Sequence, residues 1–600
     1  MSERDPTELK MPDPAKVGES VTRIAEQSRR LVEDFVERQA KEGGGDFQVL
    51  DPADMVRSFQ ELMEKMMADP ARVLESQLAL WQDYTDLWQA SLKRMMGEDS
   101  EPVIEPAPGD RRFKDEVWSE NPVFDYIKQS YLLASKYLQG SVRETEGLDP
   151  HSAKKADFYT RQYIDALAPT NFAMSNPEVL RRTVETGGEN LLTGLSNLLD
   201  DLERGKGNLR VKMTDLDRFK LGENVAVTPG KVVYQNDLMQ LLQYAPSTET
   251  VYKRPLLIIP PWINKYYILD LRPKNSFIKW AVEQGHTVFV ISWVNPDEKL
   301  AHKDFQDYML EGPLAALDAI EQATGERECK VIGYCLGGTL LASMLAYMAS
   351  KGDTRVKAAT FFVTMTDFSE PGELGVFIDE EQLARMDEQM EKTGYFDGSA
   401  MAEAFNLLRA NDLIWGFVIN NYLLGKDPFP FDLLYWNSDS TRMPCKMHSF
   451  YLHNLYEKNL LCKPNGISLD GVGIDLTKVK TPAYFISTKE DHIAPWKATY
   501  AGTRLLSGPV RFVLGMSGHI AGIVNPPSAK KYGYWCNDEL PEDCDQWLAG
   551  AESHEGSWWL DWKKWVQHHN GKKVPARVPG DGKLQVIEDA PGSYVNVRAD

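Results

Sequence analysis

The residues best suited to chemistry lie in segment 330–340, which reads Lys-Val-Ile-Gly-Tyr-Cys-Leu-Gly-Gly-Thr-Leu. Its first half is an apolar run typical of a buried strand, and its second half begins an apolar helical segment. Cys335 stands at the junction, with glycines two positions before and two positions after it. Such glycines permit a sharp strand-to-helix turn, because a Cβ there would collide with the strand or the helix. A thiol at a helix N-terminus also ionises readily, since the helix dipole favours the thiolate. The pattern indicates a nucleophile, and we favour it over a buried structural cysteine.

A nucleophile needs a base and a group that orients the base. Loops 487–492 (Ser-Thr-Lys-Glu-Asp-His) and 515–520 (Gly-Met-Ser-Gly-His-Ile) each follow an apolar run. The order Cys335, Asp491, His519 is the nucleophile–acid–base order of α/β-hydrolases. We expect Asp491 to orient His519, and His519 to take the thiol proton.

Other residues compete for these roles. His492 is the rival base, but it lies in the same loop as Asp491 and is poorly placed to pair with it. Glu490 and Asp367 are the rival acids, and a solvated loop carboxylate is the ordinary fate of such residues.

An oxyanion hole should complete the site. Its donors are expected to be the backbone N–H of Leu336, directly after the nucleophile, and that of Ile263 in loop 260–267. Asn264 in that loop has either a role here or a purely structural one.

A cysteine nucleophile has a chemical consequence. Its acyl-enzyme is a thioester, so exchange with an incoming thioester such as an acyl-CoA is nearly isoenergetic, and later attack by an alcohol is downhill. The sequence therefore favours acyl transfer from a thioester to a hydroxyl. The alternative is a thioesterase or polyester depolymerase on the same fold, and a third reading is a non-enzymatic coating protein.

From residue 225 onward, short apolar runs alternate with helical segments. This alternation predicts a mostly parallel sheet with helices on both faces, as in the α/β-hydrolase core. The expected strands are 256–259, 287–293, 330–334, 359–364, 483–488 and 510–514. The interval between the fourth and fifth strands is too long for a simple connection. We interpret about 368–475 as a cap inserted over the carboxyl ends of the strands, where ligands bind in such sheets.

The preceding residues divide into a variable helical region with a linker (1–110) and a helical domain (111–224), followed by the catalytic domain (225–600). Leu74, Leu78, Trp81, Thr85, Trp88 and Leu92 share one helical stripe. We expect this stripe to pack on its own domain, the alternative being a surface for a partner or an apolar particle. The tryptophans at 558, 559, 562 and 565 are expected to be core or docking contacts, the alternative being a granule- or membrane-facing role.

Composition narrows the function classes. The chain has 600 residues, 42% of them hydrophobic, and 88 acidic against 67 basic side chains give a net charge of -21. A nucleic-acid-coating protein is therefore excluded, since phosphate binding needs a basic surface. No apolar run is long enough to span a membrane, and the N-terminus lacks a signal-peptide core. The six cysteines form no CxxC pair, and the histidines make no metal motif, so we expect a reducing cytoplasm, no disulfides and no metal.

Several long motifs together resemble the polyhydroxyalkanoate synthases, in order and spacing. They are Pro-Pro-Trp-Ile-Asn-Lys-Tyr-Tyr-Ile-Leu-Asp-Leu at 260–271, the Gly-x-Cys-x-Gly-Gly box at 333–338, Glu-Asp-His at 490–492 and Gly-His-Ile-Ala-Gly at 518–522. The resemblance covers about 115–570 and is closest to the class I, single-subunit type.

The resemblance implies polymerisation of (R)-3-hydroxyacyl-CoA, typically 3-hydroxybutyryl-CoA, with release of CoA. It implies that Cys335 carries the growing chain, that His519 is the base and that Asp491 is its acid partner. CoA thioester would be the substrate, with no bound cofactor; the CoA-binding residues stay open, Lys265 being one candidate. The family also implies a homodimer on the surface of cytoplasmic polymer granules, in contact with granule-associated proteins.

Overall fold

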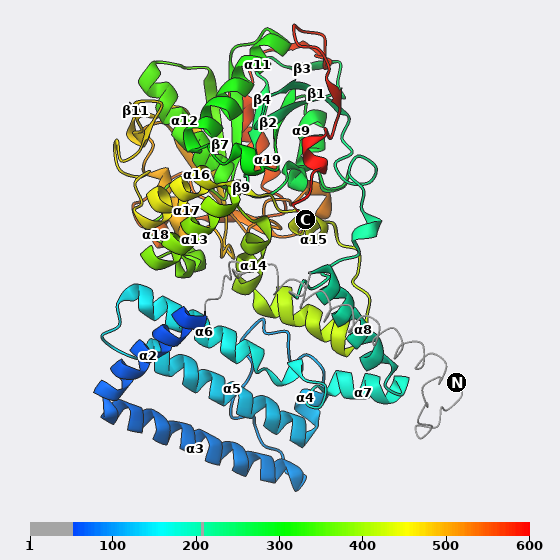
Figure 1. Cartoon of the computed structure of the whole chain (residues 1–600), viewed down its shortest axis with the longest axis vertical. Coiled ribbons are helices and arrows are strands. Elements are labelled where there is room, and N and C mark those ends of the chain that lie inside the picture. Colours follow the sequence, from blue (N-terminus) through cyan, green and yellow to red (C-terminus); the bar gives the residue numbers. More distant parts are fainter. Residues whose placement is uncertain (1–51, 206–208, 600) are drawn as a thin grey trace. The chain divides into compact units, whose positions relative to one another are not determined.

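The structure is a computed structural model that describes residues 52–205 and 209–599. The chain forms two compact units (Figure 1). Unit 1 contains the described residues up to Asp215 together with Phe405–Pro430, and unit 2 contains Leu216–Ala404 and Phe431–Asp600. Residues 1–51 of the predicted variable helical region lie outside the described residues. Within them, no helix combines the length and apolar character that a membrane span requires.

Unit 1 is helical, and its helix starts follow from the sequence. Four of its helices begin with proline directly after Asp or Asn: Asp69, Asn121, Asp149 and Asn176. Each of these side chains accepts a hydrogen bond from a backbone N–H of the first turn, and proline suits the first helical position because it needs no donor there. The helices are α2 (Pro52–Ala68), α3 (Pro70–Met95), α4 (Val117–Glu120), α5 (Pro122–Arg143), α6 (Pro150–Ala166), α7 (Pro177–Thr186) and α8 (Glu189–Arg204).

Part of the predicted cap belongs to unit 1. The π-helical segment η8 (Val418–Leu423) packs so closely on α8 that a Cβ on Gly194 would lie 1.8 Å from the Tyr422 carbonyl oxygen. The Tyr422 hydroxyl donates to Asp201 at 2.6 Å, and the Asn190 amide donates to the Leu423 carbonyl at 2.7 Å. Of the insertion expected at 368–475, residues 405–430 thus belong to unit 1 and the remainder to unit 2.

Unit 2 is built on an 11-stranded sheet, ordered β15-β14-β13-β12-β7-β6-β4-β5-β2-β1-β17. The six strands from β13 to β5 are parallel neighbours, and antiparallel strands extend both edges. All six expected strands are present, as β4 (Leu256–Ile259), β5 (Val288–Trp293), β6 (Cys329–Tyr334), β7 (Val356–Phe362), β12 (Ala483–Thr488) and β13 (Val510–Gly515). The edge strands are β1 (Gly230–Gln235), β2 (Met239–Tyr244), β14 (Gly533–Cys536), β15 (Glu552–Glu555) and β17 (Glu588–Asp589).

Helices of unit 2 cover this sheet and include the remainder of the insertion (Figure 1). The main ones are α9 (Phe277–Glu283), α10 (Phe305–Met309), α11 (Ala315–Thr324), α12 (Leu336–Lys351), α17 (Trp496–Thr503), α18 (Cys544–Ala549) and α19 (Trp559–Val566). The insertion contributes α13 (Glu380–Thr393), α15 (Asp432–Asn437), α16 (Cys445–Tyr451) and the π-helical η9 (Leu452–Glu457), while α14 (Gly398–Leu408) runs from one unit into the other.

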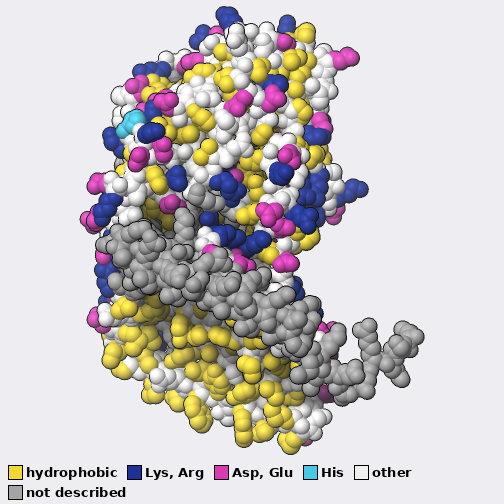
Figure 2. Space-filling view, turned by 45° about the vertical axis from the view of Figure 1, so that its right-hand side comes forward, with side chains coloured by type: hydrophobic (Ala, Val, Ile, Leu, Met, Phe, Trp, Pro, Cys, Tyr) yellow, Lys and Arg dark blue, Asp and Glu magenta, His cyan; other side chains and the backbone are white. Residues whose placement is uncertain are grey.

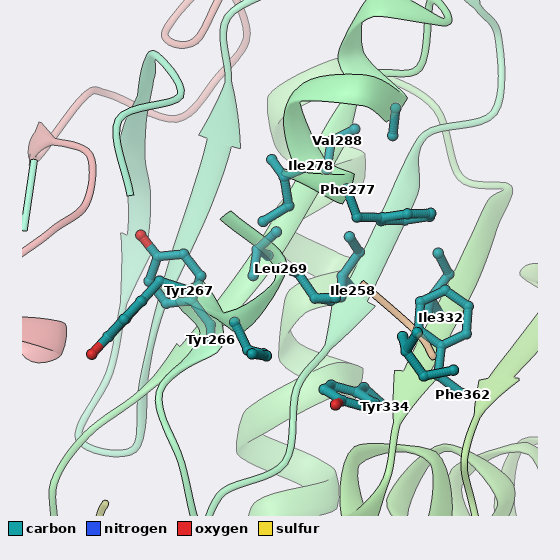
Figure 3. Packing of buried hydrophobic residues seen from close by; sticks show 14 of the residues in the cluster. Ile258, Tyr266, Tyr267, Leu269, Phe277, Ile278, Val288, Ile332, Tyr334 and Phe362 are labelled. Carbon is teal, nitrogen blue, oxygen red and sulfur yellow. The ribbon is translucent and has the colours of Figure 1, made fainter. Parts of the chain in front are cut away.

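The main hydrophobic core lies between the sheet and α9 and α19. Figure 3 shows its side chains from the sheet strands and from α9. Phe277 packs edge-on against Trp559, with ring centroids 5.1 Å apart. Trp558, Trp559 and Trp562 are each at most 1% exposed, so the expectation that the cluster is core is confirmed for these three, while Trp565 is partly buried and packs against the same core. Two buried indoles on this eight-residue helix, Trp559 and Trp562, and that of its N-cap residue Trp558 fix α19 firmly to the sheet, because aromatic side chains bury the largest apolar areas.

Candidate active site

Cys335 occupies a strained turn between β6 and α12. Its φ is 51° and its ψ is -118°, a conformation that costs a non-glycine residue about 1–3 kcal/mol. A Cβ on Gly333 would lie 2.4 Å from the Gly338 Cα, and one on Gly337 would lie 2.1 Å from the Ile259 carbonyl oxygen. Both glycines that flank Cys335 are therefore required by backbone contacts. The partly exposed thiol stands at the carboxyl end of the sheet, where a nucleophile elbow places it.

His519 and Asp491 form a buried pair. His519 Nδ1 donates to Asp491 Oδ2 at 2.7 Å, while the other carboxylate oxygen accepts the N–H groups of Ile493 and Ala494 at 2.9 Å each. The carboxylate is therefore held by its own loop, with one oxygen directed at the imidazole. This hydrogen bond leaves Nε2 as the nitrogen that can exchange a proton with a thiol.

The charge state of His519 depends on Cys335. Burial lowers the pKa of His519, but Asp491 and the Cys335 sulfur, through charge and hydrogen bonding, raise that pKa to about 10. The imidazole and the thiol are thus close enough to interact directly. The Asp491 carboxylate on one side of the ring thus favours the imidazolium form of His519.

The tryptophan cluster supports the loop that carries His519. The indole N–H of Trp558 donates to the Gly522 carbonyl at 3.0 Å, and that of Trp559 donates to the Ile523 carbonyl at 2.9 Å. This role was not predicted, because the spacing of tryptophans in a sequence does not show which loop lies above them.

The rival residues show no hydrogen bond to His519 among the described contacts. Glu490 is exposed, and Asp367 accepts hydrogen bonds from Ser369 and Asn459. His492 belongs to the same loop as Asp491, whose carboxylate contacts His519. The geometry therefore brings together Cys335, His519 and Asp491.

The two expected oxyanion donors are also close to the elbow. Leu336 is the first residue of α12, and its N–H is one of the free donors of a helix start. Ile263 follows β4 by four residues, and the clash that a Cβ on Gly337 would make with Ile259 shows how near β4 passes to the elbow. Within the described part of the chain, neither N–H donates a hydrogen bond. Both are thus available to a developing oxyanion.

Two buried cap tyrosines lie near the catalytic residues, and sequence reasoning missed them. Tyr451 packs edge-on against Trp262 at 5.7 Å, and its ring lies 5.3 Å from that of Tyr456. Burial raises the pKa of Tyr456 above its usual range, and the neighbouring Cys335 and Asp491 add to the effect. The two residues span a π-helical turn, a feature frequent at functional sites that a 3.6-residue periodicity does not reveal.

Lys265 is not suited to bind CoA phosphates. It is 3% exposed, its ammonium donates to the Val597 carbonyl at 2.6 Å, and burial lowers its pKa to about 8. A cavity of about 480 Å³ instead lies beside the catalytic loops, lined by Lys489, Glu490, Met516, Ser517, Tyr532 and Trp535. Among the described residues, one group could offer a metal three ligands, namely Asp543, Cys544 and Asp545. It is separate from the triad and largely exposed.

The sheet, the elbow and the histidine–carboxylate pair define an enzyme with the α/β-hydrolase fold. A family model for this fold matches residues 255–526, and the model described as the poly-beta-hydroxybutyrate polymerase (PhaC) N-terminus matches residues 109–281.

Curated relatives identify the family. The chain is 51% identical over 589 residues to the poly(3-hydroxyalkanoate) polymerase subunit PhaC of Rhizobium meliloti (strain 1021), covering 98% of this chain and 96% of the relative. It is 52% identical to the poly(3-hydroxyalkanoate) polymerase of Methylorubrum extorquens, over 91% of this chain and 90% of the relative. The PhaC subunit of Cupriavidus necator (strain ATCC 17699 / DSM 428 / KCTC 22496 / NCIMB 10442 / H16 / Stanier 337) is 41% identical, over 88% and 89%. The chain belongs to the poly(3-hydroxyalkanoate) polymerase family, and it is an acyltransferase.

Proposed function

We propose that this polymerase extends its polyester through a thioester on Cys335, using (R)-3-hydroxyacyl-CoA, with 3-hydroxybutyryl-CoA as the main substrate. The observation that carries the proposal is the strained Cys335 elbow beside the hydrogen-bonded His519–Asp491 pair. A thiol rather than a hydroxyl at the elbow suits exchange with CoA thioesters.

In the first step, the Cys335 thiolate attacks the thioester carbonyl of the substrate. The negative charge on the carbonyl oxygen is stabilised by the N–H groups of Leu336 and Ile263. The bond between the carbonyl carbon and the CoA sulfur breaks, and the His519 imidazolium gives its proton to that sulfur. The products are an acyl-Cys335 thioester and free CoA.

In the second step, the 3-hydroxyl group of an incoming 3-hydroxyacyl-CoA attacks the acyl-Cys335 thioester. Acylation removes the charge of Cys335, which is one of the causes that raise the pKa of His519. The neutral imidazole can then accept the hydroxyl proton. An oxoester bond forms, the carbon–sulfur bond breaks, and the thiolate leaves. One imidazole thus serves as acid and then as base, because the charge beside it changes between the steps.

A quenched reaction tests this proposal. After brief exposure to 3-hydroxybutyryl-CoA, mass spectrometry should locate the acyl group on Cys335, and longer exposure should give polymer and CoA. Cys335→Ala should form neither. Free 3-hydroxybutyrate as the sole product would instead support the thioesterase alternative, and an acyl group on another residue would refute the assignment.

We also propose that α3 docks on the polymer granule. The stripe expected to pack on its own domain is in fact exposed: Leu78 is 63% exposed, Trp81 76% and Trp88 57%. Figure 2 shows a face of unit 1 on which hydrophobic side chains gather. Apolar area of this extent on a folded protein usually marks a docking surface, and a polyester product offers an apolar one.

Charge on the stripe should weaken this docking. Trp81→Glu and Trp88→Glu should reduce co-sedimentation with polyhydroxybutyrate particles severalfold, while Gln82→Glu, which adds the same charge to α3 beside the stripe, should not. Equal binding by all three variants would contradict the proposal. The homodimer, the granule-associated proteins and the cytoplasmic location remain predictions from the resemblance.

A further inference from the structure

The Ile263 N–H has its direction set by a single peptide unit. That N–H and the Trp262 carbonyl belong to the same planar trans peptide, so they point in opposite directions. Any group that holds the Trp262 carbonyl therefore also aims the Ile263 N–H. Rotation of this one peptide would remove the donor from the oxyanion hole without moving Cys335, His519 or Asp491.

Thr441 holds this peptide unit. Its hydroxyl donates to the Trp262 carbonyl at 2.5 Å, and its own N–H donates to the Ile263 carbonyl at 3.0 Å. Thr441 is 1% exposed, so water does not compete for either bond. Two successive carbonyls of the loop are thus fixed by one residue that lies 178 positions away in the sequence from Ile263 (441 minus 263).

The contacts around Thr441 extend this hold. Its neighbour Ser440 forms a β-bridge with Asn264, and the Trp436 indole donates to the Lys265 carbonyl at 2.7 Å. On the other side of the loop, the Trp293 indole of β5 donates to the Pro260 carbonyl at 2.9 Å. Arg442, next to Thr441, is fixed in turn, because its N–H donates to Asn295 at 2.9 Å and its guanidinium to the Ala599 carbonyl at 3.0 Å.

We infer that Thr441 is a positioning residue of the oxyanion hole, whose hydroxyl locks the Trp262–Ile263 peptide with its N–H toward the substrate carbonyl. This inference rests on the proposed acyl-Cys335 mechanism. Thr441 does not touch the substrate; it acts through the peptide that it holds. The contribution belongs to the transition state, since the oxygen carries its full charge only there.

The test compares Thr441→Val with Thr441→Ser in the full chain. Valine keeps the shape and the backbone bond to Ile263 but removes the hydroxyl donor, whereas serine keeps the donor. Thr503→Val is the matched control, since Thr503 is 3% exposed and its hydroxyl donates to the Tyr500 carbonyl at 2.6 Å in α17, outside the oxyanion loop. Both valine variants lose one buried hydroxyl–carbonyl bond, so they should lose similar thermal stability.

Two reactions of Cys335 separate positioning from general damage. Acylation by 3-hydroxybutyryl-CoA passes through an oxyanion, but alkylation by iodoacetamide, a displacement at a saturated carbon, does not. Deleting an oxyanion donor costs about 10²–10³-fold in kcat. We expect Thr441→Val to lower the kcat of acylation about 10- to 100-fold, because the Thr441 N–H still restrains the loop, with KM nearly unchanged. Its alkylation rate should equal that of the wild type, and Thr441→Ser and Thr503→Val should acylate within about twofold of it.

Other outcomes overturn the inference. One is acylation of Thr441→Val at the wild-type rate. The other is an equal fall in the rates of acylation and alkylation, which would show that the substitution changes the reactivity of the Cys335 thiol itself. If Thr441→Val does not fold, Thr441→Ala against Thr441→Ser makes the same comparison. Failure of the mechanism itself is distinct, because then the wild type would carry no acyl group on Cys335.

Discussion

Replacement of Asp491 by asparagine tests the pairing on which the mechanism depends. Asp491 gives one oxygen to His519 and the other to two backbone N–H groups of its own loop. Asparagine has nearly the same shape but no charge, and it has only one acceptor oxygen. If that oxygen stays with the backbone N–H groups, the amide NH₂ faces His519 Nδ1. The imidazole must then accept at Nδ1 and carry its proton on Nε2, which is the wrong tautomer for receiving a proton.

The expected loss can be bounded from these contacts. A hydrogen bond to a charged group contributes about 1.5–3 kcal/mol, which corresponds to about a 10- to 150-fold change in rate. The wrong tautomer adds to this, and the equivalent change in a serine protease triad costs about 10⁴-fold. We therefore expect Asp491→Asn to slow acylation of Cys335 by about 10²–10⁴-fold while the protein stays folded.

Single-turnover acylation with 3-hydroxybutyryl-CoA, quenched and analysed by mass spectrometry, measures this rate. Glu490→Gln is the matched control, because it removes the adjacent exposed carboxylate, which has no part in the pair. The reasoning would be refuted if Asp491→Asn acylated within about threefold of the wild type, or if both variants lost activity equally.

Three further predictions concern the base, the elbow and the thiol. The pKa of His519 in the folded protein is raised above its ordinary value of 6.5, to about 10. Protonation of His519 therefore adds to the free energy of unfolding, fully below about pH 6.5, and this contribution is lost as the pH rises through 10. The difference in thermal midpoint between the wild type and Asp491→Asn should therefore shrink over that interval, and a constant difference would argue against the raised pKa. Gly337→Ala should abolish activity and lower the thermal midpoint by several degrees, because its Cβ would meet the Ile259 carbonyl, whereas Gly352→Ala, where a Cβ has open space, should cost only about 1 kcal/mol and leave activity intact. Cys335→Ser should slow polymerisation at least about a hundredfold, since a serine hydroxyl ionises far less readily and depends fully on the base, and polymer yield from 3-hydroxybutyryl-CoA measures this.

The central strands could be predicted because burial on both faces demands continuous apolar sequence, as in Leu-Leu-Ile-Ile of β4. The edge strands could not. β15 reads Glu-Ser-His-Glu, and three of its four residues are exposed, so nothing in its composition distinguishes it from a loop. It is a strand because β14 offers it hydrogen-bonding partners, and this pairing arises only in the tertiary structure.

The site divides in the same way. Cys335, Asp491 and His519 could be proposed from the sequence because the spacing of the glycines and the order of the loops are visible in the sequence itself. Thr441 was not, because it acts through a backbone carbonyl of a loop far away in the sequence, and a lone threonine in a polar segment carries no local signal. The same holds for Tyr451 and Tyr456, which reach the site only through the fold of the insertion.

Two tryptophan-bearing helices show what periodicity leaves undetermined. In α3 and in α19, apolar residues recur at helical spacing, so both sequences predict an amphipathic helix. Yet Trp81 is 76% exposed and Trp559 is fully buried. The difference lies in what meets each face: α19 lies against Phe277 and the sheet, while the stripe of α3 faces outward. Spacing thus identifies an apolar face, and only the fold shows whether the protein covers that face or leaves it exposed.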